Sequence, residues 1–161
     1  KVFEDERGYF FESFSWREFE EKVCKTHFVQ DNESKSQYGV LRGLHFQIPP
    51  FEQAKLVRVV KGRVLDVAVD IRKDSPTFGQ YFSLEISEDN KLQLFIPRGF
   101  AHGFAVLSDE VIFQYKCDNS PKHERAIRWN DPRLDIDWHL SADDIILSEK
   151  DMNNPLLCDT Y

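Results

Sequence analysis

The sequence predicts an all-β protein, a double-sheet antiparallel jelly roll with short peripheral helices. From residue 28 to about residue 127, short strand-like segments follow one another, with turn residues such as Ser-Pro-Thr-Phe-Gly at 75–79 between them. No long helical pattern interrupts this series, and short strands at such spacing are typical of antiparallel sandwiches and barrels. Neither a linker nor an internal repeat divides the chain, so we expect one domain over residues 1–161.

The first element expected is a short helix that begins after Ser15 and extends to about Lys22. Ser15 and Glu18 have the spacing of a capping box, in which each side chain bonds the other residue's backbone. The clearest hairpin joins residues 55–60 to residues 64–71 through Lys61-Gly62, because Gly tolerates the positive φ of a two-residue turn.

Pairing Val60 with Arg63 in this hairpin would place Lys55 opposite Ala68, and Val57 opposite Asp66. Period-2 alternation puts Lys55, Asp66 and Asp70 on one face. The other face is wholly aliphatic and consists of Leu65, Val67, Val69 and Ile71. Further strands are expected at residues 81–86, 92–96, 103–107 and 111–116, and helices are expected to begin at Ser141 and Ser148.

Composition excludes several classes of function. The formal net charge is -7 and the pI is about 5.2, so a sequence-independent nucleic-acid binder, which needs a basic face, is not expected. Apolar runs are too short to span a bilayer, so we expect no membrane partner. Three scattered cysteines suit a reducing cytoplasm better than a disulfide scaffold. The chain begins at Lys1 without Met, and we expect native residues before it.

Two segments each place an imidazole within two residues of a glycine. The first is Leu41-Arg42-Gly43-Leu44-His45. The second, Pro97-Arg98-Gly99-Phe100-Ala101-His102, resembles half of the signature of cupins, jelly-roll proteins whose histidines usually hold a metal. The other half of that signature would supply His-x-His followed by Glu, whereas this chain has His45-Phe46-Gln47. A single imidazole beside Gln is a poor ligand set for Zn or Fe, so we expect no metal.

A longer resemblance covers nearly the whole chain in order. The segments that carry it are Asp5-Glu6-Arg7-Gly8-Tyr9-Phe10-Phe11-Glu12, Phe28-Val29-Gln30-Asp31-Asn32, Leu41-Arg42-Gly43-Leu44-His45, residues 55–62, residues 66–70, residues 75–79, Gly99-Phe100-Ala101-His102-Gly103-Phe104 and Leu147-Ser148-Glu149-Lys150-Asp151. Together they resemble the dTDP-4-dehydrorhamnose 3,5-epimerase family, which is metal-independent and has a cupin-like jelly roll.

This resemblance implies inversion of C3 and C5 of dTDP-4-dehydro-6-deoxy-D-glucose to give dTDP-4-dehydro-6-deoxy-L-mannose. Both carbons are α to the C4 ketone, so removal of a proton gives an enolate that is reprotonated on the opposite face. The reaction needs a base, an opposing acid and a positive group near the ketone oxygen, and no cofactor. By resemblance His45 is the base, Asp151 orients it, Tyr115 is the acid and Lys55 stabilises the enolate oxygen.

The resemblance also implies residues that bind the sugar nucleotide, among which the planar guanidinium of Arg42 suits a pyrophosphate. They are Arg7, Glu12, Gln30, Asn32, Arg42, His102, Glu124 and Lys150. Family members are typically homodimers in which an N-terminal strand joins the partner's sheet, so Arg7 and Glu12 are expected to serve the partner's pocket. The pocket is expected to be locally basic although the chain is acidic overall.

Each role has a structural alternative. His45 could be a satisfied core histidine, Asp151 the carboxylate of a capping box begun by Ser148, Tyr115 a strand residue with its hydroxyl at the rim, and Lys55 the solvent-facing partner of Asp66. The segment after Tyr115 is shorter than is usual in the family and lacks a paired Tyr-Tyr. Two other functions therefore stay open: epimerisation at one carbon only, and sugar-nucleotide binding without catalysis.

Overall fold

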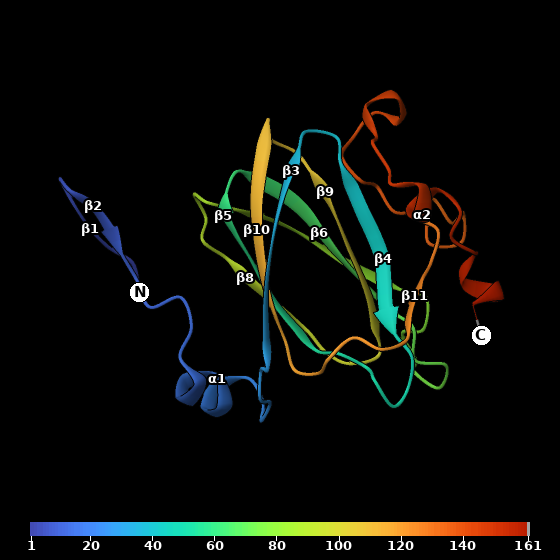
Figure 1. Ribbon diagram of the computed structural model, residues 1–161, viewed down its shortest axis with the longest axis horizontal. Coiled ribbons are helices and arrows are strands. Elements are labelled where there is room, and N and C mark those ends of the chain that lie inside the picture. The colour runs from blue at the N-terminus through green and yellow to red at the C-terminus, as the bar shows by residue number, and fades with distance from the viewer. Residues whose placement is uncertain (161) are drawn as a thin grey trace.

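The computed structural model describes residues 1–160, whose main body is two antiparallel sheets facing each other (Figure 1). The first sheet has the strand order β3-β10-β5-β8 and the second β11-β4-β9-β6-β7, while β1 and β2 form a separate hairpin. The strands are β1 (Phe3–Asp5), β2 (Gly8–Phe10), β3 (Gln30–Gln37), β4 (Leu41–Gln47), β5 (Lys55–Lys61), β6 (Arg63–Asp70), β7 (Tyr81–Ser87), β8 (Gln93–Ile96), β9 (Phe100–Val106), β10 (Glu110–Cys117) and β11 (Glu124–Ala126). The predicted jelly roll is therefore confirmed.

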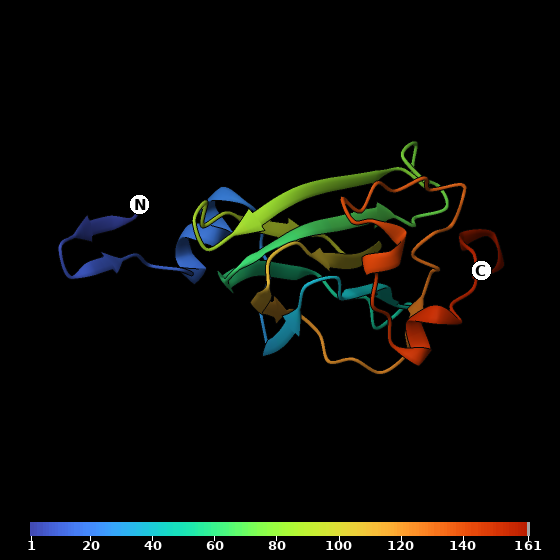
Figure 2. The same cartoon turned by 90° about the horizontal axis from the view of Figure 1, so that it is seen from above.

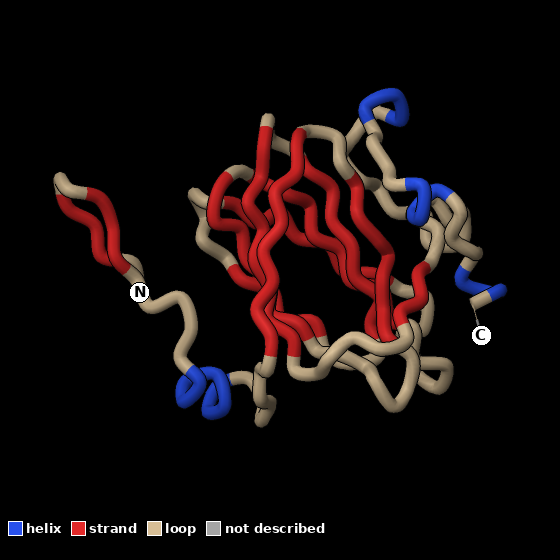
Figure 3. Tube along the Cα trace, viewed as in Figure 1, coloured by secondary structure: helices blue, strands red, loops and turns tan. Residues whose placement is uncertain are grey.

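Helices are short and lie at the periphery, as Figure 3 shows. They are α1 (Trp16–Lys22), η1 (Ala142–Asp144), α2 (Glu149–Met152) and η2 (Leu157–Asp159). Ser15 caps α1 as predicted, since its Oγ accepts from the backbone N–H of Glu18 at 3.4 Å. The Glu18 carboxylate pairs with Lys22 at 3.0 Å and makes no bond back to Ser15. No helix within residues 1–160 combines the length and apolar character that a membrane crossing requires.

The hairpin predicted between residues 55–60 and 64–71 is wrong. Strand β5 pairs with β10 and β8, whereas β6 pairs with β7 and β9, so Lys61-Gly62 is a corner at which the chain passes from one sheet to the other. Gly62 has φ +83, and a Cβ there would lie 2.1 Å from the carbonyl oxygen of Glu110. Glycine is thus required both by the positive φ and by the lack of space for a Cβ. A two-residue hairpin turn would also have required the positive φ.

The predicted division of β6 into two faces is confirmed. Its aliphatic side chains contribute to a core that the C-terminal segment covers, with Trp138 and Leu157 packed in the same cluster. The opposite face contributes Val64 and Ala68 to a second core between the sheets, where they meet Phe104 and Phe113. Figure 2 shows the C-terminal segment at the opposite end of the molecule from the N-terminal hairpin.

The two acidic positions of β6, Asp66 and Asp70, are buried, contrary to the default expectation for a solvent face. Asp70 is 1% exposed and accepts hydrogen bonds from Arg72, Ser75 and Thr77, at 2.6 to 3.0 Å. The Arg72 guanidinium, with the two hydroxyls, holds the pKa of this carboxyl well below its usual range even though burial opposes the shift. The segment 75–79 therefore serves to close a turn around Asp70, far from any proposed chemistry.

Candidate active site

A cavity of about 390 Å³ is lined by strands of both sheets and by α2. Of the residues proposed from the sequence, it brings together all four catalytic candidates and most of the binding candidates. The lining residues are Asn32, Glu33, Ser34, Arg42, His45, Lys55, His102, Gly103, Phe104, Phe113, Tyr115, Glu124, Ser148, Lys150 and Asp151. Segments more than 100 residues apart in the chain thus meet at one place.

His45, in β4, is bound to a buried carboxylate. Its Nε2 lies 2.9 Å from Oδ1 of Asp151, whose side chain is 6% exposed. Because Asp151 is ionised, Nε2 donates to it, and in the neutral form of the imidazole the lone pair lies on Nδ1. Nδ1 is buried without a hydrogen-bond partner among residues 1–160, with the nearest carboxylate oxygen, from Glu124, 3.7 Å away. The imidazole is therefore held in a tautomer that can accept a proton.

Asp151 combines two interactions that the sequence offered as alternatives. Ser148 caps α2 by accepting from the backbone N–H of Asp151 at 3.1 Å, and its hydroxyl donates to Asp151 Oδ2 at 2.9 Å. The other carboxylate oxygen meets His45. Burial alone would raise the pKa of Asp151, but the hydrogen bonds from His45, Ser148 and Asn154 outweigh it and lower the pKa. The cap thus fixes the carboxylate that orients the imidazole.

Lys55, in β5, has no ion-pair partner within residues 1–160, and its Nζ lies 5.8 Å from the centre of the Tyr115 ring. Burial lowers the pKa of Lys55, against the opposing influence of Cys117, Glu124 and Asp66. The alternative of a solvent-facing pair with Asp66 is wrong, because Asp66 is fully buried and bound to His102. A cation without a counter-charge is available to a ligand in this cavity.

Tyr115, in β10, faces the same cavity from the opposite sheet to His45. Burial raises the pKa of its phenol, so the hydroxyl keeps its proton near neutral pH. Beside it, Phe104 and Phe113 stack with ring centres 4.2 Å apart and form an apolar part of the wall. Tyr115 is the only tyrosine among the described lining residues, and residues 116–121, which follow it, contribute none of the lining.

His102, which is one of the binding residues expected from the sequence, forms a second buried pair with Asp66, which the sequence did not assign to the site. Asp66 Oδ2 lies 2.9 Å from His102 Nε2, and burial lowers the pKa of His102. His102 in β9 is directly opposite His45 in β4. The strands approach closely here, since a Cβ on Gly103 would lie 2.6 Å from the Arg42 carbonyl oxygen. A charged residue within the aliphatic run of β6 was the signal that could have identified Asp66.

The binding candidates fall into three groups: five residues that line the cavity, Gln30 beside one of them, and Arg7 with Glu12, which do not line it. Asn32, Arg42, His102, Glu124 and Lys150 line the cavity, where Arg42 Nε donates to Ser36 Oγ at 3.2 Å and Lys150 pairs with Glu124. Gln30 lies outside the lining but donates to Asn32 Oδ1 at 2.9 Å. The lining includes the cations Arg42, Lys55 and Lys150, with Glu33, Glu124 and Asp151 also present.

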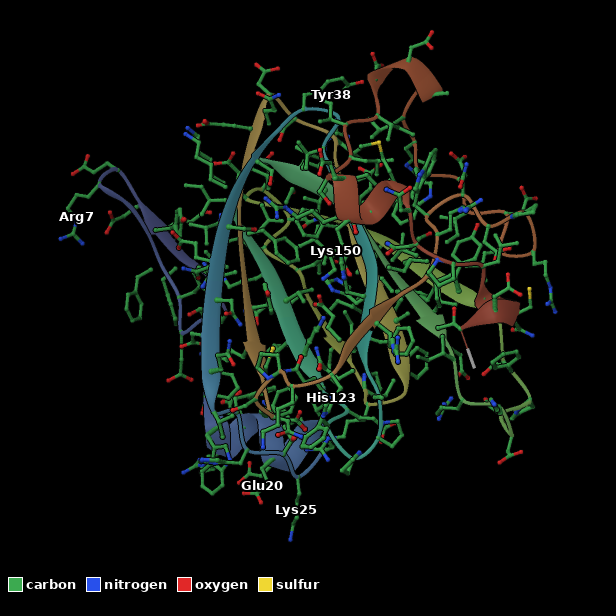
Figure 4. The ribbon with its side chains drawn as sticks, turned by 45° about the vertical axis from the view of Figure 1, so that its right-hand side comes forward. Arg7, Glu20, Lys25, Tyr38, His123 and Lys150 are labelled. Atoms are coloured by element: carbon green, nitrogen blue, oxygen red, sulfur yellow. The ribbon has the colours of Figure 1, made fainter. Side chains whose placement is uncertain are left out.

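Arg7 and Glu12 are not brought to the cavity of their own chain. Arg7 lies at the tip of the β1–β2 hairpin, which extends away from the sheets, and pairs with its neighbour Asp5 at 2.6 Å (Figure 4). Glu12 is exposed in the segment that follows. The hairpin also exposes Phe3 and Phe10, the latter to 70%. Arg7 and Glu12 thus do not line the cavity of their own chain.

Within residues 1–160, no three His, Cys, Asp or Glu side chains are arranged to hold a metal ion. The cavity brings together an imidazole bound to a carboxylate, a phenol that keeps its proton near neutral pH, and a lysine without an ion-pair partner among residues 1–160. Groups of these kinds can remove a proton, deliver one, and stabilise negative charge on an oxygen between them.

Comparison with known proteins agrees with this chemistry. A family model described as dTDP-4-dehydrorhamnose 3,5-epimerase matches residues 1–159. The chain is 56% identical to the dTDP-4-dehydrorhamnose 3,5-epimerase of Shigella flexneri, over 99% of this chain and 88% of the relative. The crystal structure of that enzyme from Elizabethkingia anophelis is similar with a TM-score of 0.94 and 55% identity, covering 100% of this chain and 90% of the other.

A further crystal structure contains a ligand. It is the dTDP-6-deoxy-D-glucose-3,5-epimerase of Legionella pneumophila in complex with dTDP-4-keto-L-rhamnose. Its TM-score with this chain is 0.94 at 50% identity, covering 98% of this chain and 85% of that one.

Proposed function

The chain belongs to the dTDP-4-dehydrorhamnose 3,5-epimerase family, and from this premise we propose how its cavity inverts C3 and C5 of dTDP-4-dehydro-6-deoxy-D-glucose. The product is dTDP-4-dehydro-6-deoxy-L-mannose, so the chain is an isomerase acting on a nucleotide-linked sugar. The observation that carries the mechanism is that His45 with Asp151, Tyr115 from the opposite sheet, and the unpaired Lys55 line one cavity.

His45 removes the proton from the carbon next to the C4 ketone, and the electrons of the broken C–H bond move to the ketone oxygen as an enolate. Asp151 offsets the charge of the imidazolium that results. The Lys55 ammonium stabilises the enolate oxygen, a contribution that is strong in a cavity from which water is excluded. Tyr115 then donates its phenolic proton to the other face of the carbon, which inverts the centre. His45 then releases its proton to solvent and Tyr115 takes one up from solvent, and the same sequence at the second α carbon completes the reaction.

The nucleotide part of the substrate would be held by groups at the cavity wall. Arg42 and Lys150 match the charge of a pyrophosphate, and the guanidinium can bind it through two parallel hydrogen bonds. Asn32, His102 and Glu124 supply polar contacts, while Gln30 acts through Asn32, whose amide it fixes. The pairing of Lys150 with Glu124 would be exchanged for contacts to the ligand.

Proton exchange with solvent tests this function. Incubation of the enzyme with dTDP-4-dehydro-6-deoxy-D-glucose in deuterated water is expected to incorporate deuterium at both C3 and C5, as followed by NMR. Deuterium at only one carbon would show a single-centre epimerase, a possibility raised by the lone tyrosine of the cavity. Absence of exchange in protein that still binds dTDP would show a binding module and contradict the proposal.

The site is also proposed to be completed by a second copy of the chain. The exposed aromatic hairpin β1–β2 and the position of Arg7 at its tip support a homodimer in which Arg7 and Glu12 of one protomer reach its partner's cavity. Three free cysteines support residence in a reducing cytoplasm.

Mixing two impaired variants tests the shared site. Arg7→Ala is expected to bind substrate weakly, because a pyrophosphate contact is lost, and His45→Ala to lack the base. If the hairpins are exchanged, a mixed dimer combines an intact His45 from one protomer with an intact Arg7 from the other. Remixing the two variants is therefore expected to restore part of the lost turnover. A fully active monomer in sedimentation, or no recovery after remixing, would contradict the shared site.

A further inference from the structure

A buried thiol that takes no part in the proposed mechanism lies beside Lys55. Cys117 is the last residue of β10, directly opposite Lys55 in the antiparallel pair of β10 and β5. Opposed residues of antiparallel strands project to the same face, so its side chain is on the cavity side of the sheet with that of Lys55. Cys117 is 2% exposed, and its Sγ lies 3.9 Å from the amide nitrogen of Asn32.

Another lysine of the same sheet lies opposite a carboxylate and forms an ion pair with it. Lys116, one residue earlier and on the other face, is opposed on β3 by Asp31, and the two form an ion pair of 2.8 Å. At Lys55 the corresponding cross-strand position holds a thiol. Burial raises the pKa of the Cys117 thiol, although Lys55 opposes that shift, so the group stays neutral.

The other charged or titratable groups that face Lys55 come from four elements. Asp66 of β6 is bound to His102 of β9, and Glu124 of β11 is paired with Lys150. Tyr115 of β10 presents its ring to the ammonium. Asp66 and Glu124 are thus engaged elsewhere, and position 117, directly across the strand pair, is a position from which a short acidic group could neutralise Lys55.

We propose that Cys117 is a positioning residue for Lys55: a small, neutral side chain that packs beside the lysine and leaves its ammonium without an ion-pair partner. The inference rests on the proposed function, in which Lys55 stabilises the enolate oxygen. A carboxylate at position 117 would bind the ammonium as Asp31 binds Lys116, and would compete with the enolate for it. A smaller side chain would leave a void into which the lysine could turn.

A matched pair of variants separates charge from size. Cys117→Asp and Cys117→Asn have nearly the same volume and differ in one negative charge. The KM for the sugar nucleotide is expected to differ by no more than a few-fold between the two variants. The kcat of Cys117→Asp is expected to be about 100-fold below that of Cys117→Asn, which is the size of effect produced by losing an oxyanion-stabilising group. The alkaline limb of its kcat–pH profile, which reports Lys55, is expected to move up by about one pH unit, because the carboxylate favours the charged amine.

Equal kcat values and equal alkaline limbs in folded Cys117→Asp and Cys117→Asn would overturn the inference. If Cys117→Asp does not fold, the variants Cys117→Ala and Cys117→Ser test the inference instead. We then expect Cys117→Ala to lower kcat about fivefold at unchanged KM. Cys117→Ser is expected to keep most of the wild-type kcat, because its hydroxyl fills the void that Cys117→Ala leaves. Wild-type kcat in both would overturn the proposal. Absence of deuterium exchange in the wild-type enzyme would contradict the proposed function, and wild-type kcat in Lys55→Met would contradict the role of Lys55 in it; if only the Cys117 series is without effect, this inference alone has failed.

Discussion

His45→Ala is expected to abolish deuterium incorporation at both C3 and C5 while leaving dTDP binding nearly unchanged. One base on β4 begins both inversions in the proposed mechanism, so the two carbons should lose exchange together. Removing a general base costs about 10²- to 10⁴-fold in rate, and we expect a loss toward the upper end because Nδ1 of His45 is buried without a hydrogen-bond partner among residues 1–160. NMR in deuterated water measures the exchange, and titration calorimetry measures dTDP binding.

A matched control is His27→Ala. His27 is exposed in the segment between α1 and β3 and does not line the cavity, so its removal should change exchange less than twofold, within the usual range for surface substitutions. Normal exchange in a folded His45→Ala protein would remove His45 from the role of base. Loss of exchange at only one carbon would assign the other inversion to a different group.

The orienting role of Asp151 explains why the sequence alone left its function open. A Ser-x-x-Asp pattern is ordinarily a helix cap, and Ser148 does cap α2. That the same carboxylate also meets His45 depends on where a segment more than 100 residues away in the chain packs against β4, which no local pattern contains. The family resemblance supplied that contact as an expectation, and in the structure the two atoms are 2.9 Å apart.

Strand faces were predictable where strand partners were not. Alternation along β6 separates Leu65 from Asp66 whichever strands lie on either side, because side-chain direction is a property of the strand itself. Pairing depends on the rest of the chain, and Gly62 permits both a hairpin turn and the corner between sheets that forms. Thus Lys55 lines the cavity from one sheet, while Asp66, in the other sheet, is bound to the lining residue His102.

The position of Arg7 illustrates a third kind of limit. Its motif is part of the resemblance, yet the hairpin that carries it leaves the body of its own chain. Whether a residue serves its own cavity or a partner's is decided by assembly, which no local sequence pattern encodes. The proposed exchange of hairpins therefore depends on the remixing experiment.

Lys55→Met is expected to lower kcat about 10²- to 10³-fold with KM changed only a few-fold, which is the range for loss of one oxyanion-stabilising group. Methionine keeps most of the length and the apolar stem and removes the charge. Because the ammonium acts on the enolate oxygen, an atom that is negative only after proton removal, the effect should fall on kcat. Exchange and turnover should decline together, since both pass through the enolate.

The pH profile gives a second and independent signature of Lys55. Burial lowers the pKa of this amine below its ordinary value, so below the lowered pKa the lysine is charged and active, and kcat falls as the pH rises through it. This alkaline limb should lie below the ordinary lysine value of about 10.4 and should be absent from Lys55→Met. Lys35→Met, which removes an exposed lysine paired with Glu110, should keep both the limb and kcat. An unchanged limb in Lys55→Met would mean that another group titrates there, and unchanged kcat would leave the enolate to be stabilised by a different cation of the cavity.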